Sequence, residues 1–232
     1  MKIMTFNTQH CMNYITKEID FESVANVIKD FDADIVGLNE MRGEGTDAEF
    51  TKQVEILSEL TGMKYFYFAP AINIKGKGLY GNGFLSKTPI LTAENIPIPD
   101  PVERRYNGYY ETRCLVKLTL LGGLTVLVTH FGLNRDEQEN AVKTVVDNIE
   151  ESKCILMGDF NACPNDSVLI PIREKMCDTA EKFDEDKLSF PSYCPDQKID
   201  YIFVSRDIEV LEADIPEIIV SDHRPHTAII NL

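Results

Sequence analysis

The sequence predicts an α/β fold in which helices cover mixed β-sheets. Three observations lead to this prediction. The spacing of apolar residues changes repeatedly between the strand and the helix period, no internal repeat, linker or low-complexity tract is present, and 232 residues are enough to bury one large core. We therefore expect one domain, residues 1–232.

The first quarter of the chain alternates strand and helix. Short apolar runs rich in β-branched residues predict two strands, at 2–7 and 33–40. Apolar residues at helical spacing predict a helix over 19–31 with Asp20 as its N-terminal cap. The same spacing predicts a second helix over 47–62, which Gly62 ends.

The rest of the chain is richer in strands. Between residues 64 and 132 the helical pattern fades, and strands are predicted at 64–70, 81–90, 114–121 and 124–131. Gly122 and Gly123 indicate a hairpin turn between the last two of these. A helix is predicted over 135–152. An irregular region ends near residue 195, and the remaining strands are predicted at 154–160, 198–205, 208–214 and 226–232.

Composition excludes several classes of protein. No apolar run approaches the roughly 20 residues that span a bilayer, and the N-terminal apolar segment is too short for a signal-peptide core. We expect no integral membrane segment and a cytoplasmic location. The six cysteines lie far apart without a C-x-x-C pair, which indicates reduced thiols and argues against a zinc site.

The net charge of −15 bears on the binding partner. Proteins that bind duplex DNA usually neutralise its phosphates with a basic surface, so this acidic chain disfavours a duplex partner. Five basic residues in one central stretch could form a local cleft or could be solvated loop charges: Lys75, Lys77, Arg104, Arg105 and Arg113.

Polar side chains recur at the ends of the predicted strands. They are Asn7, Glu40, His130, Asp159, Asn161, Asp200, Asp222 and His223. Active sites of layered α/β folds gather where strands meet loops. No constellation of a nucleophilic serine or cysteine accompanies them. Carboxylates and amides suit an oxygen-loving cation, so we expect Mg²⁺ or Mn²⁺ and an anionic substrate.

Each of these residues alone has a structural explanation. Asn7 fits a turn, His130 fits a hydrogen-bonded core histidine, and Asp200 fits a loop anchor. For the site to be absent, a separate structural explanation would have to apply to every one of these residues, although all of them occur near the ends of predicted strands. Taken as a set, the residues therefore favour a shared site.

Four motifs carry a resemblance to a known family: "LNE" at 38–40, "GDFN" at 158–161, "IDYIF" at 199–203 and "SDH" at 221–223. Together they resemble the endonuclease/exonuclease/phosphatase superfamily of metal-dependent phosphoesterases, over nearly the whole chain. The resemblance implies a four-layer α/β sandwich, in which two packed sheets are flanked by helices.

The resemblance also implies roles at the metal and at the attacking water. Glu40, with Asn7 nearby, would hold the principal metal, and Asp222 would add a direct or water-mediated contact. Asp159 would orient or deprotonate the water, and Asn161 would donate to the phosphoryl oxygens. Two positions apart on extended chain, Asp159 and Asn161 are expected to project to the same side.

The remaining roles concern the phosphate. His223 would stabilise charge on it, with its tautomer fixed by Asp200. His130 matches a second histidine of the sphingomyelinase, deadenylase and deoxyribonuclease I branches and would bind the phosphate or assist the leaving oxygen. Arg113 would contact a phosphate or form an ion pair with Glu111. Asn82 would orient His130 or, between two glycines, serve in a turn.

The substrate is less well defined. The segment "LNEMRG" departs from the pattern of abasic-site endonucleases, and "DFNACP" departs from that of inositol 5-phosphatases. The segment 96–111 could dock on a membrane or shape a substrate site. We expect a monomeric phosphodiesterase that acts on a small molecule, a lipid headgroup or a single-stranded nucleic acid. The alternatives are a DNA or RNA nuclease and, with less support, a non-catalytic binding module.

Overall fold

The strands form two mixed six-stranded sheets in a computed structural model that describes residues 1–183 and 185–232. The first sheet has the spatial order β11 (Glu209–Asp214), β12 (His226–Asn231), β1 (Lys2–Asn7), β2 (Ile35–Gly45), β4 (Gly78–Ser86), β3 (Tyr65–Asn73). The second has the order β5 (Ile90–Pro97), β6 (Cys114–Leu120), β7 (Thr125–His130), β8 (Cys154–Asp159), β10 (Asp200–Ser205), β9 (Met176–Asp178).

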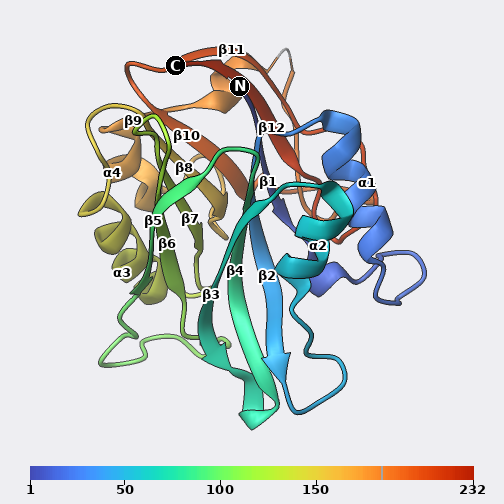
Figure 1. Cartoon of the computed structure of the whole chain (residues 1–232). Coiled ribbons are helices and arrows are strands. Elements are labelled where there is room, and N and C mark those ends of the chain that lie inside the picture. Colours follow the sequence, from blue (N-terminus) through green and yellow to red (C-terminus); the bar gives the residue numbers. More distant parts are fainter. Residues whose placement is uncertain (184) are drawn as a thin grey trace.

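Helices lie on the outer faces of the two sheets (Figure 1). Helices α1 (Phe21–Phe31) and α2 (Gln53–Thr61) lie on the side of the first sheet, and α3 (Arg135–Val146) and α4 (Ile170–Arg173) on the side of the second. Four short 3₁₀ turns complete the described elements: η1 (Gln9–Cys11), η2 (Ile74–Gly76), η3 (Ser167–Leu169) and η4 (Thr179–Lys182). The expected four-layer α/β sandwich is confirmed.

Strand β8 shows why its sequence is an unbroken apolar run. Successive side chains point to opposite faces of a strand. Ile155 and Met157 therefore pack in the core between the sheets, whereas Leu156 packs in the outer core under α3. Because both faces are covered, the strand has no charged residue before Asp159, which is its last residue.

Several local signals act as expected. The Asp20 side chain accepts a hydrogen bond from the backbone of Ser23 at 2.9 Å and caps α1. Gly62 ends α2 with φ of 73°, in the left-handed region that favours glycine. The turn between β6 and β7 contains Gly122 and Gly123, which also have positive φ.

The structure differs from the expected elements in several places, and it has helix α4 and strand β9 in the region that was expected to be irregular. Helix α2 starts at Gln53 rather than at residue 47, although Phe50 before it is still buried. The predicted strand 81–90 is divided between β4 and β5, because Pro89 has no N–H to donate to a ladder. Helix α3 ends at Val146, and the segment that follows it is irregular.

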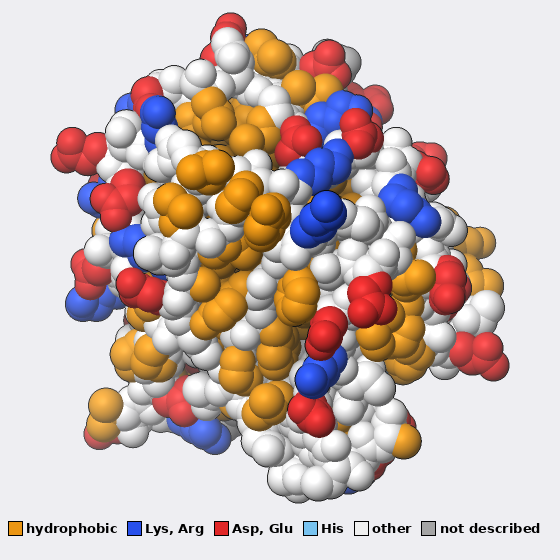
Figure 2. All heavy atoms as spheres, in the orientation of Figure 1, with side chains coloured by type: hydrophobic (Ala, Val, Ile, Leu, Met, Phe, Trp, Pro, Cys, Tyr) orange, Lys and Arg blue, Asp and Glu red, His pale blue; other side chains and the backbone are white. Residues whose placement is uncertain are grey.

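The charge of the surface and the length of the helices are relevant to the nucleic-acid and membrane partners considered from the sequence. Figure 2 shows basic side chains interspersed with acidic ones on the face of Figure 1, and hydrophobic side chains gathered over β3 and β5. None of the helices in the described part of the chain is both long and apolar enough to cross a membrane. All six cysteines are free thiols.

Candidate functional site

Strand register brings three of the predicted residues side by side in the second sheet. His130 ends β7, Asp159 ends β8, and Asp200 begins β10. Asp159 is in register with His130 on the parallel strand and with Asp200 on the antiparallel strand. Asn7 ends β1 in the facing sheet, and its Nδ2 donates to Asp159 Oδ2 at 3.0 Å. The site therefore spans both sheets at one edge of the sandwich.

Glu40 reaches this edge through an irregularity in β2. The ladder between β2 and β4 shifts between Leu38 and Met41, and Glu40 has φ of 62°. A left-handed backbone costs a non-glycine residue on the order of 1–3 kcal/mol, and such residues concentrate at functional sites. The bulge turns the half-buried Glu40 carboxylate toward Asn7, whose Nδ2 lies 3.2 Å from Oε1.

Asp159 is the centre of the cluster. Its Oδ2 lies 3.0 Å from Asn7 Nδ2, 3.4 Å from His130 Nε2 and 3.7 Å from His223 Nε2. Burial raises the pKa of Asp159 to about 7, and attraction to His223 opposes that rise. Three side chains therefore present nitrogen atoms to one carboxylate oxygen.

His223 is held by an acid. Its Nδ1 lies 2.8 Å from Asp200 Oδ2, and its ring packs against Phe190 with the centroids 4.7 Å apart. Burial alone would lower the pKa of His223, but attraction to Asp200 and Asp159 outweighs burial and raises it to about 10. The raised pKa favours the imidazolium, whose Nδ1–H donates to Asp200, while Nε2 lies 3.7 Å from Asp159 Oδ2, too far for a hydrogen bond.

His130 lies beside a cation, whereas His223 lies beside acids. It is buried, and Arg113 Nη1 lies 3.2 Å from its Nδ1. Burial and the nearby Arg113 charge both lower the pKa of His130 well below its ordinary value, so this ring is neutral at pH 7. Arg113 also forms the ion pair with Glu111 that the sequence left open, at 2.5 Å.

Asn161 joins the cluster, but its backbone is not extended as expected. Its φ is 46°, so the chain turns after β8, and the Asn161 backbone donates to Asp159 Oδ1 at 2.9 Å. The Asn161 side chain donates to the carbonyl of Phe131 at 3.0 Å and lies 3.2 Å from His130 Nε2. The tight turn, rather than strand alternation, brings Asp159 and Asn161 together.

The interpretation of Asn82 as a turn residue is wrong. It lies inside β4, is 2% exposed and donates to the carbonyl of Cys114 at 3.0 Å. No hydrogen bond joins it to His130 among the described contacts. Instead, its Oδ1 accepts from Asn39 at 2.8 Å.

Asn39 is a residue that the sequence analysis missed. Its side chain connects the two sheets, because it accepts from the backbone N–H of Asp159 at 3.0 Å and donates to the carbonyl of Thr129 at 2.8 Å. It thereby fixes the backbone beside both Asp159 and His130. Its place in "LNE", next to Glu40, was visible, but nothing in the spacing indicated partners 90 and 120 positions away.

Replacing Asn39 by leucine is expected to destabilise the fold. The change leaves the Asp159 N–H and the Thr129 carbonyl buried without a partner, at about 1–3 kcal/mol each. We expect the free energy of unfolding in urea to fall by about 3 kcal/mol. Asn95→Leu is the control, because Asn95 makes one hydrogen bond at an exposed position. A loss no greater than that of the control would contradict the bridging role.

One place where acids of the cluster could hold a divalent cation is at Glu40, whose carboxylate is affected by the charge of Asp222. Burial and repulsion by Asp222 both raise the pKa of Glu40, and a cation bound there would relieve the repulsion. A second group, Asp159, Asp200 and His223, has ligand atoms within 4.8 Å of one another. Among the described residues, this second group is the one set of three acids and histidines whose ligand atoms lie close enough together to hold a cation.

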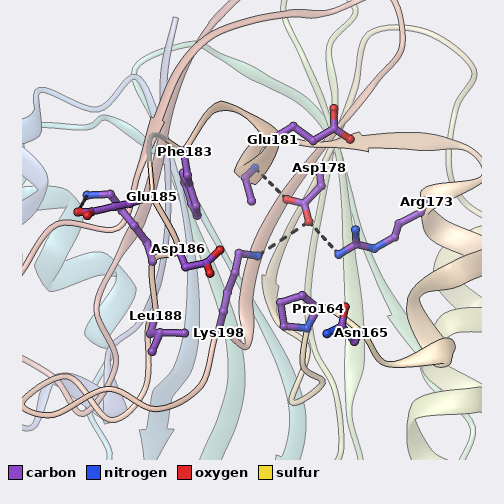
Figure 3. Close-up of a pocket in the computed structure, with 12 residues that line it drawn as sticks. Pro164, Asn165, Arg173, Asp178, Glu181, Phe183, Glu185, Asp186, Leu188 and Lys198 are labelled. Atoms are coloured by element: carbon purple, nitrogen blue, oxygen red, sulfur yellow. Dashed lines mark hydrogen bonds and ion pairs between the residues drawn. The ribbon is translucent and has the colours of Figure 1, made fainter.

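A separate cavity of about 760 Å³ is lined by none of the predicted site residues. Figure 3 shows Asp178 on its wall, between Arg173 at 3.1 Å and Lys198 at 3.9 Å. Burial lowers the pKa of Lys198 to about 8, although Asp178 opposes the change. Asp178 thus pairs with two cations on the wall of this cavity.

Comparisons with known proteins bear on the fold and the family of the chain. The chain resembles an endonuclease/exonuclease/phosphatase from Beutenbergia cavernae (21% identity, TM-score 0.79, covering 100% of this chain and 71% of that one). It also resembles a mannosyl-6-phosphatase from Bacteroides thetaiotaomicron (15%, 0.74, 100% of both chains) and the human Nocturnin catalytic domain with bound sulfate (15%, 0.71, 100% and 93%). No curated protein sequence matches the chain. The model of the Endonuclease/Exonuclease/phosphatase family matches residues 4–223. The chain therefore belongs to the endonuclease/exonuclease/phosphatase family.

Proposed function

We propose that the protein is a Mg²⁺- or Mn²⁺-dependent phosphodiesterase in which Asp159 activates water. One observation carries the proposal: the nitrogens of Asn7, His130 and His223 converge on a single oxygen of Asp159, and the same Asn7 amide also contacts Glu40. Donors that meet at one point beside a carboxylate suit an anionic group and an attacking water.

Each residue of the cluster has its own role in the proposed hydrolysis. Asp159 orients the water and takes its proton as the bond from oxygen to phosphorus forms and the bond to the leaving oxygen breaks. The His223 imidazolium, the Asn161 amide and neutral His130 donate to the phosphoryl oxygens, where charge develops. Asn7 holds the two carboxylates of Glu40 and Asp159 in place through its Nδ2.

The cation contributes in one way. Mg²⁺ or Mn²⁺, held by Glu40 and Asp222, would supply positive charge next to the phosphoryl group. In the described part of the cluster the other positive charges are His223 and Arg113, and Glu111 already pairs with Arg113. This modest charge favours a diester, which carries one negative charge, over a monoester, which carries close to two.

The net charge of −15 also bears on the kind of substrate. It disfavours duplex DNA, as does the mixture of acidic and basic side chains in Figure 2. We therefore propose a small molecule, a lipid headgroup or a single-stranded nucleic acid as the substrate.

A substrate panel tests the proposal. We expect hydrolysis of bis-p-nitrophenyl phosphate with Mn²⁺ and its loss in excess EDTA, followed by recovery when Mn²⁺ is restored. Plasmid, single-stranded DNA, RNA, sphingomyelin and sugar phosphates then define the class. Hydrolysis that persists in EDTA would refute the role of the cation. Strong plasmid nicking at physiological salt would refute the argument from charge.

A further inference from the structure

The ring of His130 lies between a cation and an anion. Arg113 Nη1 is 3.2 Å from Nδ1, and Asp159 Oδ2 is 3.4 Å from Nε2. All three side chains are enclosed, with exposed fractions of 11% for Arg113, 5% for His130 and 2% for Asp159. Solvent therefore screens the field across the ring weakly.

These neighbours decide where a neutral ring carries its one proton. A guanidinium has only donors, so Nδ1 must accept from Arg113 and cannot carry a hydrogen. The proton then lies on Nε2, toward the Asp159 carboxylate. Asn161 Nδ2 also lies 3.2 Å from Nε2, and the Phe131 carbonyl at 3.0 Å takes only one of its two hydrogens, so two donors face the ring. The charged guanidinium is the stronger of these donors, which favours Nδ1 over Nε2 as the acceptor.

Arg113 is itself fixed. The same Nη1 that faces His130 lies 2.5 Å from Glu111 Oε1, and a guanidinium Nη1 has two hydrogens to share between the two partners. The Glu111 side chain is 12% exposed. Rotation of Arg113 away from His130 would disturb this ion pair with a largely enclosed acid, which opposes the rotation.

We propose that Arg113 is a positioning residue that holds His130 in the tautomer with hydrogen on Nε2. The proposal rests on the proposed phosphodiesterase function and gives Arg113 a task other than phosphate binding. His130 and His223 then both aim an Nε2–H at the same place. They reach this state from opposite partners: an arginine at Nδ1 of His130 and an aspartate at Nδ1 of His223.

The tautomer can be read without any substrate. The chain has four histidines, so long-range ¹⁵N–¹H spectra of the full-length protein assign each ring. At pH 7 without metal we expect the ¹⁵N shift of an unprotonated nitrogen for Nδ1 of His130 and that of a protonated nitrogen for Nε2. A protonated Nδ1 in the wild-type protein would overturn the proposal, whether or not the protein hydrolyses phosphodiesters.

Variants then test whether Arg113 sets the tautomer. Arg113→Met is expected to move the two His130 nitrogens toward the averaged shifts of a mixed population. Arg113→Lys, which keeps a donor and a charge, is expected to retain most of the wild-type pattern. Arg105→Met is the matched control, because Arg105 pairs with Glu139 at an exposed position and should leave His130 unchanged. Wild-type shifts in a folded Arg113→Met protein would overturn the proposal. If that variant does not fold, the wild-type and Arg113→Lys spectra decide.

Kinetics separate positioning from phosphate binding. For a positioning residue we expect Arg113→Met to lower kcat on the order of 10²-fold, the cost of one misdirected donor, with KM changed less than about threefold. In a His130→Ala background the same substitution should cost less than about threefold in kcat, because its effect passes through His130. Full additivity of the two changes, or a loss confined to KM, would overturn the proposal.

Discussion

Replacing Asp159 by asparagine is expected to lower kcat by about 10²- to 10⁴-fold, the usual contribution of a positioned general base. The amide has the size of the carboxylate but cannot take a proton from water. Asp159 is 1% exposed and lies within 4 Å of both catalytic-site histidines, so the shape of the cluster should survive the change. The loss is therefore expected in the chemical step rather than in folding.

The measurement is hydrolysis of bis-p-nitrophenyl phosphate at saturating Mn²⁺, together with circular dichroism and thermal unfolding. Asp147→Asn is the matched control, because Asp147 pairs with Lys143 at the exposed end of α3 and should leave kcat unchanged. A folded Asp159→Asn protein with kcat within tenfold of the wild type would contradict the role of Asp159 as the base.

The periodic parts of the fold could be predicted because they depend on local pattern. A strand covered on both faces, such as β8, must be apolar at every position until it reaches the site. The cap at Asp20 and the stop at Gly62 are equally local. These elements place Asn7, His130 and Asp159 at strand ends, which is why the sequence could identify them as candidates.

The parts that could not be predicted depend on contacts distant in sequence. The bulge at Glu40 follows from its pairing with β4, and the left-handed turn at Asn161 follows from the Phe131 carbonyl thirty positions earlier. Asn39 looked like a neighbour of Glu40 and proved to bridge the sheets. A single sequence shows which polar residues are present but not which of them meet.

The difference in protonation between His130 and His223 also could not be predicted from the sequence. His130 is the last residue of β7 and His223 lies in the loop before β12, and no local feature of the sequence distinguishes their protonation. Asp200 and Asp159 raise the pKa of His223, whereas burial and then the Arg113 charge lower the pKa of His130. Only the three-dimensional neighbours determine this difference, so it emerges from the structure alone.

The Glu40→Gln variant is expected to bind Mn²⁺ at least tenfold more weakly without loss of the metal-free fold. Glutamine removes the charge that attracts the cation but keeps the size of the side chain. Burial and Asp222 raise the pKa of Glu40, so the ionised carboxylate is disfavoured in the folded protein. The folded protein therefore loses stability as the pH rises from the pKa of Glu40 in the unfolded chain to its raised pKa in the folded state. At neutral pH the neutral amide should therefore leave the metal-free protein as stable as the wild type, or more so.

Calorimetric titration with Mn²⁺ and thermal unfolding with and without metal read the two effects separately. Saturating the wild type at 100 times Kd should stabilise it by about 2.7 kcal/mol, and Glu40→Gln should show a much smaller gain at the same concentration. Glu44→Gln, an exposed acid on the same strand, controls for loss of charge alone. A Glu40→Gln protein with wild-type Mn²⁺ affinity and a lower metal-free melting temperature would show that Glu40 has a structural role. In that case the cation would have to be sought elsewhere in the cluster, because Glu40 is the only acid that the bulge in β2 directs toward Asn7 among the described residues.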